Sequence, residues 1–269
     1  MNICIVAGAR PNFIKVAPLI RAIERYQAQG NHKDLHYELI YSGRDDDPTL
    51  EDSLFNDLQI KKPTTYLGVD CANLNVLVGE VMAKFEHYLE EHPTDIVVVV
   101  DDLSSTMGVA IVTKKQGLVL AHIAAGTRSF DINMPKEINR LVIDGLSDIL
   151  FTAGMSNNSI ANREGAELSK VYMVGNILID NLRLLHNKLH RPKLMDQLGL
   201  KEGEYIVFTL NRKKLIADED NLHDMIAATC ESLKVNAVPV VAPVRDKAAI
   251  AIKKAMQGTD SDMKLVEPL

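Results

Sequence analysis

Short runs of apolar residues recur along the chain, and most of them are rich in valine and isoleucine without polar alternation. Strands that are buried on both faces of a sheet have this pattern. The pattern therefore predicts a first series of strands at residues 3–6, 37–41, 96–100, 118–123, 149–151 and 171–174.

Apolar residues at helical spacing lie between several of these runs. The longest pattern places Leu77, Val81 and Phe85 on one face, and Pro93 follows its end. Because strands and helices alternate, we expect an α/β fold with a parallel, doubly wound sheet. The other helices of this series are predicted at residues 104–117, 135–146 and 156–165.

A second series of elements follows a charged segment that contains a proline. A helix at residues 177–189 leads into this segment, His190-Arg191-Pro192. After it the pattern changes back to alternating strands and helices, which predicts a second α/β unit. Strands are expected at 205–210, 238–242 and 265–266, and helices near 225–233 and at 247–256.

The two series predict two Rossmann-like domains. We expect the first at residues 1–176 and the second at 193–269, with a linker helix and segment at 177–192. The second series stops without a terminal helix, so we expect this domain to be incomplete. Two such domains bind a ligand in the cleft at the carboxyl ends of their strands.

The composition narrows the class of protein. With 46% hydrophobic and 25% charged residues, the 269 residues suffice for a packed core. The formal net charge of −6 and the lack of tryptophan or of a basic, aromatic-containing stripe argue against nucleic-acid binding. We recognise no signal peptide and no apolar run that would span a bilayer, so we expect a cytoplasmic protein. Cys4, Cys71 and Cys230 lie far apart, which favours unpaired thiols over disulfides or metal ligands.

A glycine turn follows the first predicted strand and begins a helix. Gly8 allows a sharp turn, and Pro11 suits the first helical turn. The free N–H groups of that turn favour an anion, and Arg10 and Lys15 add two cations beside it. The segment predicts a phosphate or diphosphate pocket at the carboxyl edge of the sheet. The alternative is a plain strand–turn–helix with solvated charges.

Several acidic and basic side chains also follow predicted strands. Asp101 and Asp102 end the strand at 96–100, where open α/β sheets bind ligands. We favour a site role for Asp102, leave Asp101 open, and find no third ligand that would make the pair a metal site. His122 ends an apolar strand and is expected to be a satisfied buried or cleft-lining histidine. Glu137 lies in a first helical turn, where it can also act on the helix dipole alone.

Six segments, taken in their order along the chain, resemble the sequence motifs of a known protein family. The segments are residues 8–15 with Ala17-Pro18, 102–106, 122–128, 135–140, 174–180 and 209–212. The last five resemble the motifs G-D-T-x-S-T, H-V-E-A-G-L-R, P-E-E-x-N-R, V-T-G-N-x-x-I-D and T-x-H-R of the non-hydrolysing UDP-N-acetylglucosamine 2-epimerase family. Each motif alone is weak, but together they cover almost the whole chain.

The resemblance implies a fold, a reaction and a set of site residues. It implies a two-domain GT-B-type fold, a homodimer, and interconversion of UDP-GlcNAc and UDP-ManNAc by elimination and re-addition of UDP, with no cofactor and no metal. The catalytic residues that it implies are Lys15, Asp102, Glu137 and Arg140. The substrate-binding residues that it implies are Gly8, Arg10, Arg128, Asn139, Asn211 and Arg212.

Three positions depart from the family pattern. Ala124, Lys136 and Asn211 stand where the motifs have glutamate, glutamate and histidine. Neither the alanine nor the asparagine side chain can take up or release a proton at neutral pH. We therefore expect the chain to epimerise UDP-GlcNAc far more slowly than a typical family member, or not at all. Two other functions stay open: a sugar-nucleotide sensor or subunit without turnover, and another GT-B-like enzyme such as a glycosyltransferase.

Overall fold

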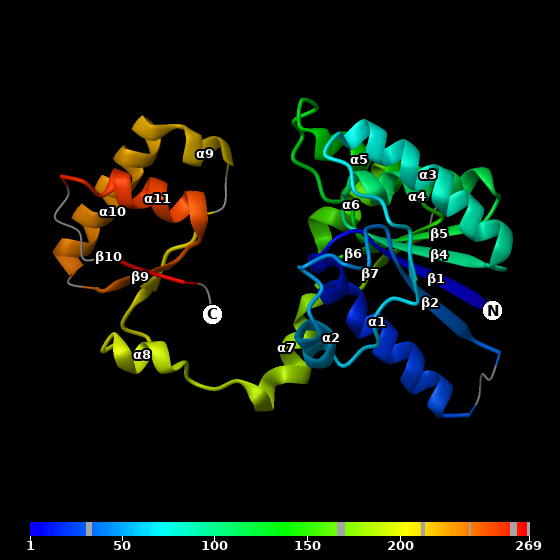
Figure 1. The fold of residues 1–269 in the computed structure, drawn as a ribbon, viewed down its shortest axis with the longest axis horizontal. Coiled ribbons are helices and arrows are strands. Elements are labelled where there is room, and N and C mark those ends of the chain that lie inside the picture. Colours follow the sequence, from blue (N-terminus) through cyan, green and yellow to red (C-terminus); the bar gives the residue numbers. More distant parts are fainter. Residues whose placement is uncertain (31–33, 166–169, 211–212, 237, 259–262, 268–269) are drawn as a thin grey trace. The chain divides into compact units, whose positions relative to one another are not determined.

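The computed structural model describes residues 1–30, 34–165, 170–210, 213–236, 238–258 and 263–267. The chain divides into two compact units, residues 1–188 and residues 189–269 (Figure 1). Each unit contains a parallel sheet with helices between its strands. The α/β class that the alternating pattern predicts is therefore confirmed.

The first unit is built on a parallel sheet of seven strands in the order β3-β2-β1-β4-β5-β6-β7. The chain starts in the middle of this sheet, adds β2 and β3 on one side, and then returns to build the other side. The strand order therefore reverses between β1 and β4, and open α/β sheets bind ligands at such a point. The strands are β1 (Asn2–Ala7), β2 (His36–Tyr41), β3 (Thr65–Tyr66), β4 (Ile96–Val100), β5 (Val119–Ala125), β6 (Ile149–Thr152) and β7 (Lys170–Met173).

Helices cover both faces of this sheet (Figure 1). Successive strand residues point to opposite faces, so Ile5 packs with Phe13 of α1 while Val6 packs with Phe85 of α3. Both layers are apolar, which explains why the strand sequences lack polar alternation. The helices are α1 (Arg10–Ala28), α2 (Asp52–Leu58), α3 (Leu74–Glu91), α4 (Ser104–Lys115), α5 (Pro135–Leu146), α6 (Met155–Glu164) and α7 (Leu178–Leu185), followed by the 3-10 turn η1 (His186–Lys188).

The second unit has a parallel sheet of three strands in the order β10-β9-β8. Leu222 and Ile226 of α10 and Ile252 of α11 pack with the central strand β9. The elements are α8 (Lys193–Gln197), β8 (Ile206–Val207), α9 (Lys213–Ala217), α10 (Glu219–Asn236), β9 (Val240–Pro243), α11 (Asp246–Ala255) and β10 (Met263–Val266).

Some elements differ from the sequence-based expectation. The strand expected at 205–210 is shorter, at Ile206–Val207, and α2, β3, α8 and α9 are not among the predicted elements. These are short elements, which have too few residues to give a periodic signal. The helix expected at 177–189 is α7, at Leu178–Leu185, and it belongs to the first unit.

Side-chain hydrogen bonds attach α7 to α1. Arg21 donates from Nη2 to the Asn181 Oδ1 atom at 2.8 Å, and the Asn181 amide donates to the carbonyl of Ile14. Asn181 is buried, so both of its polar ends are satisfied inside the first unit. No helix in the described part of the chain is long and apolar enough to cross a membrane.

Gly8 is required by the close approach of the β1–α1 turn to α4. Its φ lies outside the left-handed region, so the sharp-turn argument from the sequence does not apply to it. A Cβ atom at this position would lie 2.2 Å from the Ser105 Oγ atom and 3.0 Å from the Leu103 Cδ1 atom. Leu103 immediately precedes α4 and Ser105 lies in its first turn. The absence of a side chain at Gly8 therefore allows the β1–α1 turn to lie close to the start of α4.

We expect Gly8→Ala to lower the free energy of unfolding by about 1–3 kcal/mol, because the added methyl group overpacks this turn. Urea denaturation of the purified chain measures the change. Gly79→Ala is the matched control, since Gly79 lies in α3 with open space around its Cβ position. That change is expected to stabilise the chain by up to about 1 kcal/mol. Equal stability of Gly8→Ala and wild type would contradict the close-approach argument.

Candidate functional site

A cavity of about 340 Å³ lies at the carboxyl ends of β4 and β5. This is the edge of the sheet at which the strand order reverses, so the cavity occupies the place where open α/β sheets bind ligands. Charged side chains from three elements meet there. The lining residues are Ala9, Pro11, Asn12, Lys15, Asp101, Asp102, Leu103, His122, Ala124, Thr127, Lys136, Arg140 and Asp144.

Asp101 is the first residue after β4, and its backbone is left-handed, with a φ of +62°. Its carboxylate accepts a hydrogen bond from the Asn12 Nδ2 atom at 2.8 Å and contacts the Lys15 ammonium. The side chain is 18% exposed. The cation that the sequence placed beside a phosphate is therefore paired with a carboxylate of the protein itself.

Asp102 is held by two cations of α5. Its Oδ2 atom accepts a hydrogen bond from the Arg140 Nε atom at 2.9 Å and forms an ion pair with Arg140 Nη2 at 2.7 Å, and its Oδ1 atom lies 3.2 Å from the Lys136 ammonium. The Asn139 amide donates to the Asp102 carbonyl at 2.9 Å. Asp102 and Arg140 thus converge on one cavity as the sequence indicated, whereas Asn139 is buried and orients the backbone of Asp102.

His122 links the end of β4 to α5. Its Nδ1 atom lies 2.7 Å from the Asp144 Oδ1 atom, and its Nε2 atom lies 3.0 Å from the Asp101 carbonyl oxygen. The ring is buried and both nitrogens have partners, as expected for a satisfied histidine. The opposite Asp144 oxygen accepts from the Gly126 N–H at 3.0 Å, so Asp144 joins β5 to the following loop.

Arg128 does not line the cavity, and its expected role in substrate binding is not supported by its position. The guanidinium is 1% exposed and pairs with Asp144 at 2.7 Å and with Glu164 at 2.8 Å. Burial alone would raise the pKa of Asp144, but hydrogen bonds and charge from His122 and Arg128 outweigh it and lower that pKa. The arginine of this motif therefore neutralises a buried carboxylate.

Glu137 is 3% exposed and all its contacts are within the protein. Its carboxylate accepts from the N–H groups of Ser129 and Phe130, from the Ser129 hydroxyl, and from Arg140 at 3.0 Å. Burial raises the pKa of Glu137, but these donors outweigh it and hold the pKa at about 2. Glu137 therefore stays ionised at neutral pH and orders the loop before α5, which does not fit a proton-transfer role.

The N–H groups at the start of α1 are largely used by the chain itself. Gly8 and Ala9 both donate to the Asn12 Oδ1 atom, at 2.9 and 3.2 Å, and the Asn12 N–H donates to the Ala9 carbonyl. Most of the N–H groups that the sequence analysis expected to bind an anion at this turn therefore already have a hydrogen-bond partner in the protein. The Arg10 side chain is exposed, and Asn211 and Arg212 lie outside the described residues.

Sequence reasoning missed Asn12 and Asp144. Asn12 is the third residue of α1, and a polar side chain there can reach back to the N–H groups before the helix, which is a signal that the sequence does contain. Asp144 has no such local signal, because its partner His122 is 22 residues away. Among the described residues, no three histidine, cysteine, aspartate or glutamate side chains are grouped as metal ligands.

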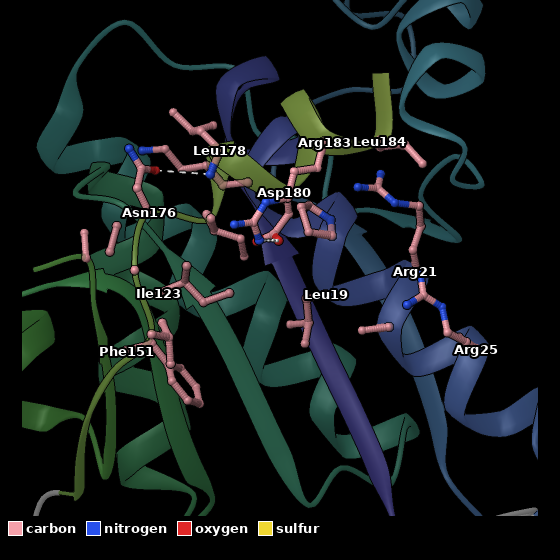
Figure 2. A pocket seen from close by; sticks show the side chains of 18 residues that line it. Leu19, Arg21, Arg25, Ile123, Phe151, Asn176, Leu178, Asp180, Arg183 and Leu184 are labelled. Carbon is pink, nitrogen blue, oxygen red and sulfur yellow. Dashed lines mark hydrogen bonds and ion pairs between the residues drawn. The ribbon is translucent and has the colours of Figure 1, made fainter. Parts of the chain in front are cut away.

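A second, larger cavity of about 780 Å³ is shown in Figure 2. Lys15 and Ala124 line both this cavity and the first one. The second cavity lies between α1, α7 and the ends of β5 and β6. Apolar side chains such as Ile123 and Phe151 line one part of it, and arginines line another. These arginines are Arg21, Arg25 and Arg183.

Comparisons with known proteins agree with this geometry. The family model described as UDP-N-acetylglucosamine 2-epimerase matches residues 27–269. A protein of Methanococcus maripaludis called a UDP-N-acetylglucosamine 2-epimerase homolog is 32% identical over 246 residues, which is 89% of this chain and 65% of the relative. The chain thus spans just under two thirds of that relative's length.

Solved structures show the same fold. The Methanocaldococcus jannaschii UDP-GlcNAc 2-epimerase in complex with UDP-GlcNAc and UDP is similar with a TM-score of 0.78 and 24% identity, over 100% of this chain and 74% of that one. The Neisseria meningitidis UDP-GlcNAc 2-epimerase bound to UDP-GlcNAc has a TM-score of 0.82 and 20% identity, over 100% and 73%. At these identities the likeness shows the GT-B-like α/β fold alone.

We expect Glu137→Gln to lower the free energy of unfolding by about 1–3 kcal/mol at pH 7, because it leaves buried donors without their charged partner. Since the pKa of Glu137 in the folded chain is lowered to about 2, its contribution is present above about pH 4.5 and is lost as the pH falls toward 2. Denaturant melts at several pH values measure this. The gap between variant and wild type is expected to close at low pH.

Glu80→Gln is the control for this measurement, since Glu80 is exposed on α3. It is expected to change the free energy of unfolding by less than about 0.5 kcal/mol at every pH. A Glu137→Gln difference that stays constant from pH 7 to pH 3 would show that lost packing, and not the ionised carboxylate, accounts for the effect.

Proposed function

The chain belongs to the UDP-N-acetylglucosamine 2-epimerase family, and we propose that it binds a UDP-sugar at the cavity of the first unit and interconverts UDP-GlcNAc and UDP-ManNAc. One observation carries the proposal: the two adjacent carboxylates, Asp101 and Asp102, lie among three cations at the switch point of the sheet. The cations are Lys15, Lys136 and Arg140.

The reaction needs groups of both charges in one place. Inversion at C2 requires removal and return of the C2 proton, and a carboxylate at the cavity can accept it. Departure of UDP from C1 leaves negative charge on the diphosphate, which fixed cations stabilise. Asp101 and Asp102 supply the first kind of group, and the lysines and Arg140 supply the second.

Because some positions depart from the family motifs, fewer side chains at the cavity can transfer a proton to or from the sugar. Ala124 lines the cavity but has no ionisable group, and Glu137 is buried with its donors. Lys136 lies 3.2 Å from Asp102 and adds a positive charge at the mouth of the site. His122 and Asp144 also line the cavity but are almost fully buried. The two aspartates that follow β4 are therefore the carboxylates best placed to exchange a proton with a ligand.

Assembly as a homodimer and a cytoplasmic location are further parts of the proposal. Exposed apolar side chains support a protein partner: Phe130 and Ile132 in the loop before α5, and Ile138 and Leu141 on α5 itself. Soluble monomers seldom leave such side chains clustered. Size-exclusion chromatography with light scattering tests this part, and a monomer at micromolar concentration would contradict it.

We expect the wild-type chain, incubated with UDP-GlcNAc in D₂O, to form UDP-ManNAc with deuterium at C2, as followed by NMR. Arg140→Gln is expected to lower kcat/KM about 10- to 100-fold, because it removes the charge-assisted pair with Asp102. Arg163→Gln is the control, since Arg163 is exposed on α6 and pairs only with Glu164 among the contacts described. It is expected to leave the rate unchanged.

The alternatives predict other results in the same experiment. UDP-sugar binding by calorimetry without deuterium exchange would identify a sensor and contradict the epimerase proposal. Absence of binding by any UDP-sugar in a panel would contradict a sugar-nucleotide site altogether. Transfer of the sugar to an added acceptor, without deuterium incorporation at C2, would identify a glycosyltransferase.

A further inference from the structure

Asp101 has a backbone conformation that most residues avoid. Four residues other than glycine have a positive φ in the described part of the chain: Gln59, Asp101, Ala124 and Phe130. Left-handed backbone is unfavourable for a residue with a Cβ atom, although aspartate tolerates it better than most. Such strain persists where the surroundings impose it, and it is concentrated at functional sites.

Hydrogen bonds from neighbouring residues hold Asp101 in this left-handed backbone conformation. Its carbonyl accepts from the His122 ring at 3.0 Å, and its N–H donates to the Ile123 carbonyl at 3.3 Å. The next carbonyl, of Asp102, is held by Asn139. The peptide between β4 and α4 is thus fixed from two sides, and the left-handed turn directs the Asp101 carboxylate toward Lys15 and Asn12 in the cavity.

The carboxylates around the cavity differ in how many hydrogen-bond and ion-pair partners they already have within the protein. Asp102 pairs with two cations: it accepts a hydrogen bond from Arg140 Nε, and both Arg140 and Lys136 lie within ion-pair distance of it. Glu137 and Asp144 are almost fully buried and have their donors inside the protein. Asp101 has only one amide and one ammonium as side-chain partners in the described residues, and a carboxylate offers about four acceptor positions.

We propose that Asp101 is a catalytic residue that takes the proton from C2 of the sugar, with Lys15 as its charge partner and Asp102 as the anchor of Arg140. This proposal rests on the proposed epimerase function. The C2–H bond breaks and its proton bonds to a carboxylate oxygen of Asp101. The electron pair of that bond forms the C1=C2 double bond, and the C1–O bond breaks with its electrons leaving on UDP.

The Lys15 contact couples the two halves of this step. Before the transfer, the ammonium is balanced by the Asp101 carboxylate. When the carboxylate becomes neutral, the positive charge of Lys15 is no longer balanced by it, and at the same time negative charge develops on the departing diphosphate. In re-addition UDP returns to C1, a proton from solvent water bonds to C2 on the opposite face, and Asp101 releases its proton to water.

The backbone strain gives this proposal a sharp test, because glycine adopts a φ of +62° at no steric cost. Asp101→Gly is expected to keep the melting temperature within a few degrees of wild type. The same variant is expected to lower C2 deuterium exchange from UDP-GlcNAc in D₂O by about 100-fold or more, which is the range for a positioned proton-transfer group. Asp101→Asn keeps the hydrogen-bonding shape of the side chain and is expected to show the same loss.

The control is Gln59→Gly, which relieves a similar φ of +55° at the end of α2, away from the cavity. It is expected to keep full exchange activity. Asp102→Asn is expected to raise KM and to retain measurable exchange. Exchange that is retained in Asp101→Asn and abolished in Asp102→Asn would overturn the assignment of Asp101 while leaving the epimerase proposal intact. A wild-type chain without exchange would overturn both.

Discussion

The hydrogen bond from the His122 ring to the Asp101 carbonyl is the contact on which the candidate site depends. It fixes the peptide at the end of β4, and the Asn139 amide fixes the next carbonyl along the chain. These two bonds decide where both aspartate side chains point. Together with the bond from the Asp101 N–H to the Ile123 carbonyl, they hold the left-handed turn at Asp101 in place.

A line of paired side chains supports this contact, and its members other than Glu164 are almost fully buried. His122 pairs with Asp144, Asp144 pairs with Arg128, and Arg128 pairs with Glu164. Burying charges is costly unless each has a partner of good geometry, and here each member faces another at hydrogen-bond distance. The line joins β5, α5 and α6, so the position of the turn after β4 depends on the packing of the whole carboxyl edge of the sheet.

The same edge keeps cations and carboxylates in balance at the cavity. Lys15 faces Asp101, and Lys136 with Arg140 faces Asp102. Such pairing holds the charged groups in place before a ligand arrives, which lowers the reorganisation needed during reaction. In the proposed reaction, a diphosphate that enters has to compete with these carboxylates, which would link proton transfer to the release of the cations.

Sequence alone determined the layered architecture and the general location of the site. Alternating apolar runs and helical patterns are local properties, and parallel strands bring their carboxyl ends to one edge. This is why Asp102 and Arg140, which are far apart in the chain, line one cavity at that edge, whereas Arg128, which was expected in the same cleft, does not.

The tertiary structure alone decided what each side chain does. Arg128 and Glu137 match motif positions, yet both are buried with partners in the protein. The Asn12 side chain accepts hydrogen bonds from N–H groups that the sequence analysis expected to bind an anion. Asp101 contacts Lys15, which lies 86 residues away in the sequence. No local pattern encodes such pairings, because the distance and orientation between groups on different elements exist only once the sheet and its helices have packed.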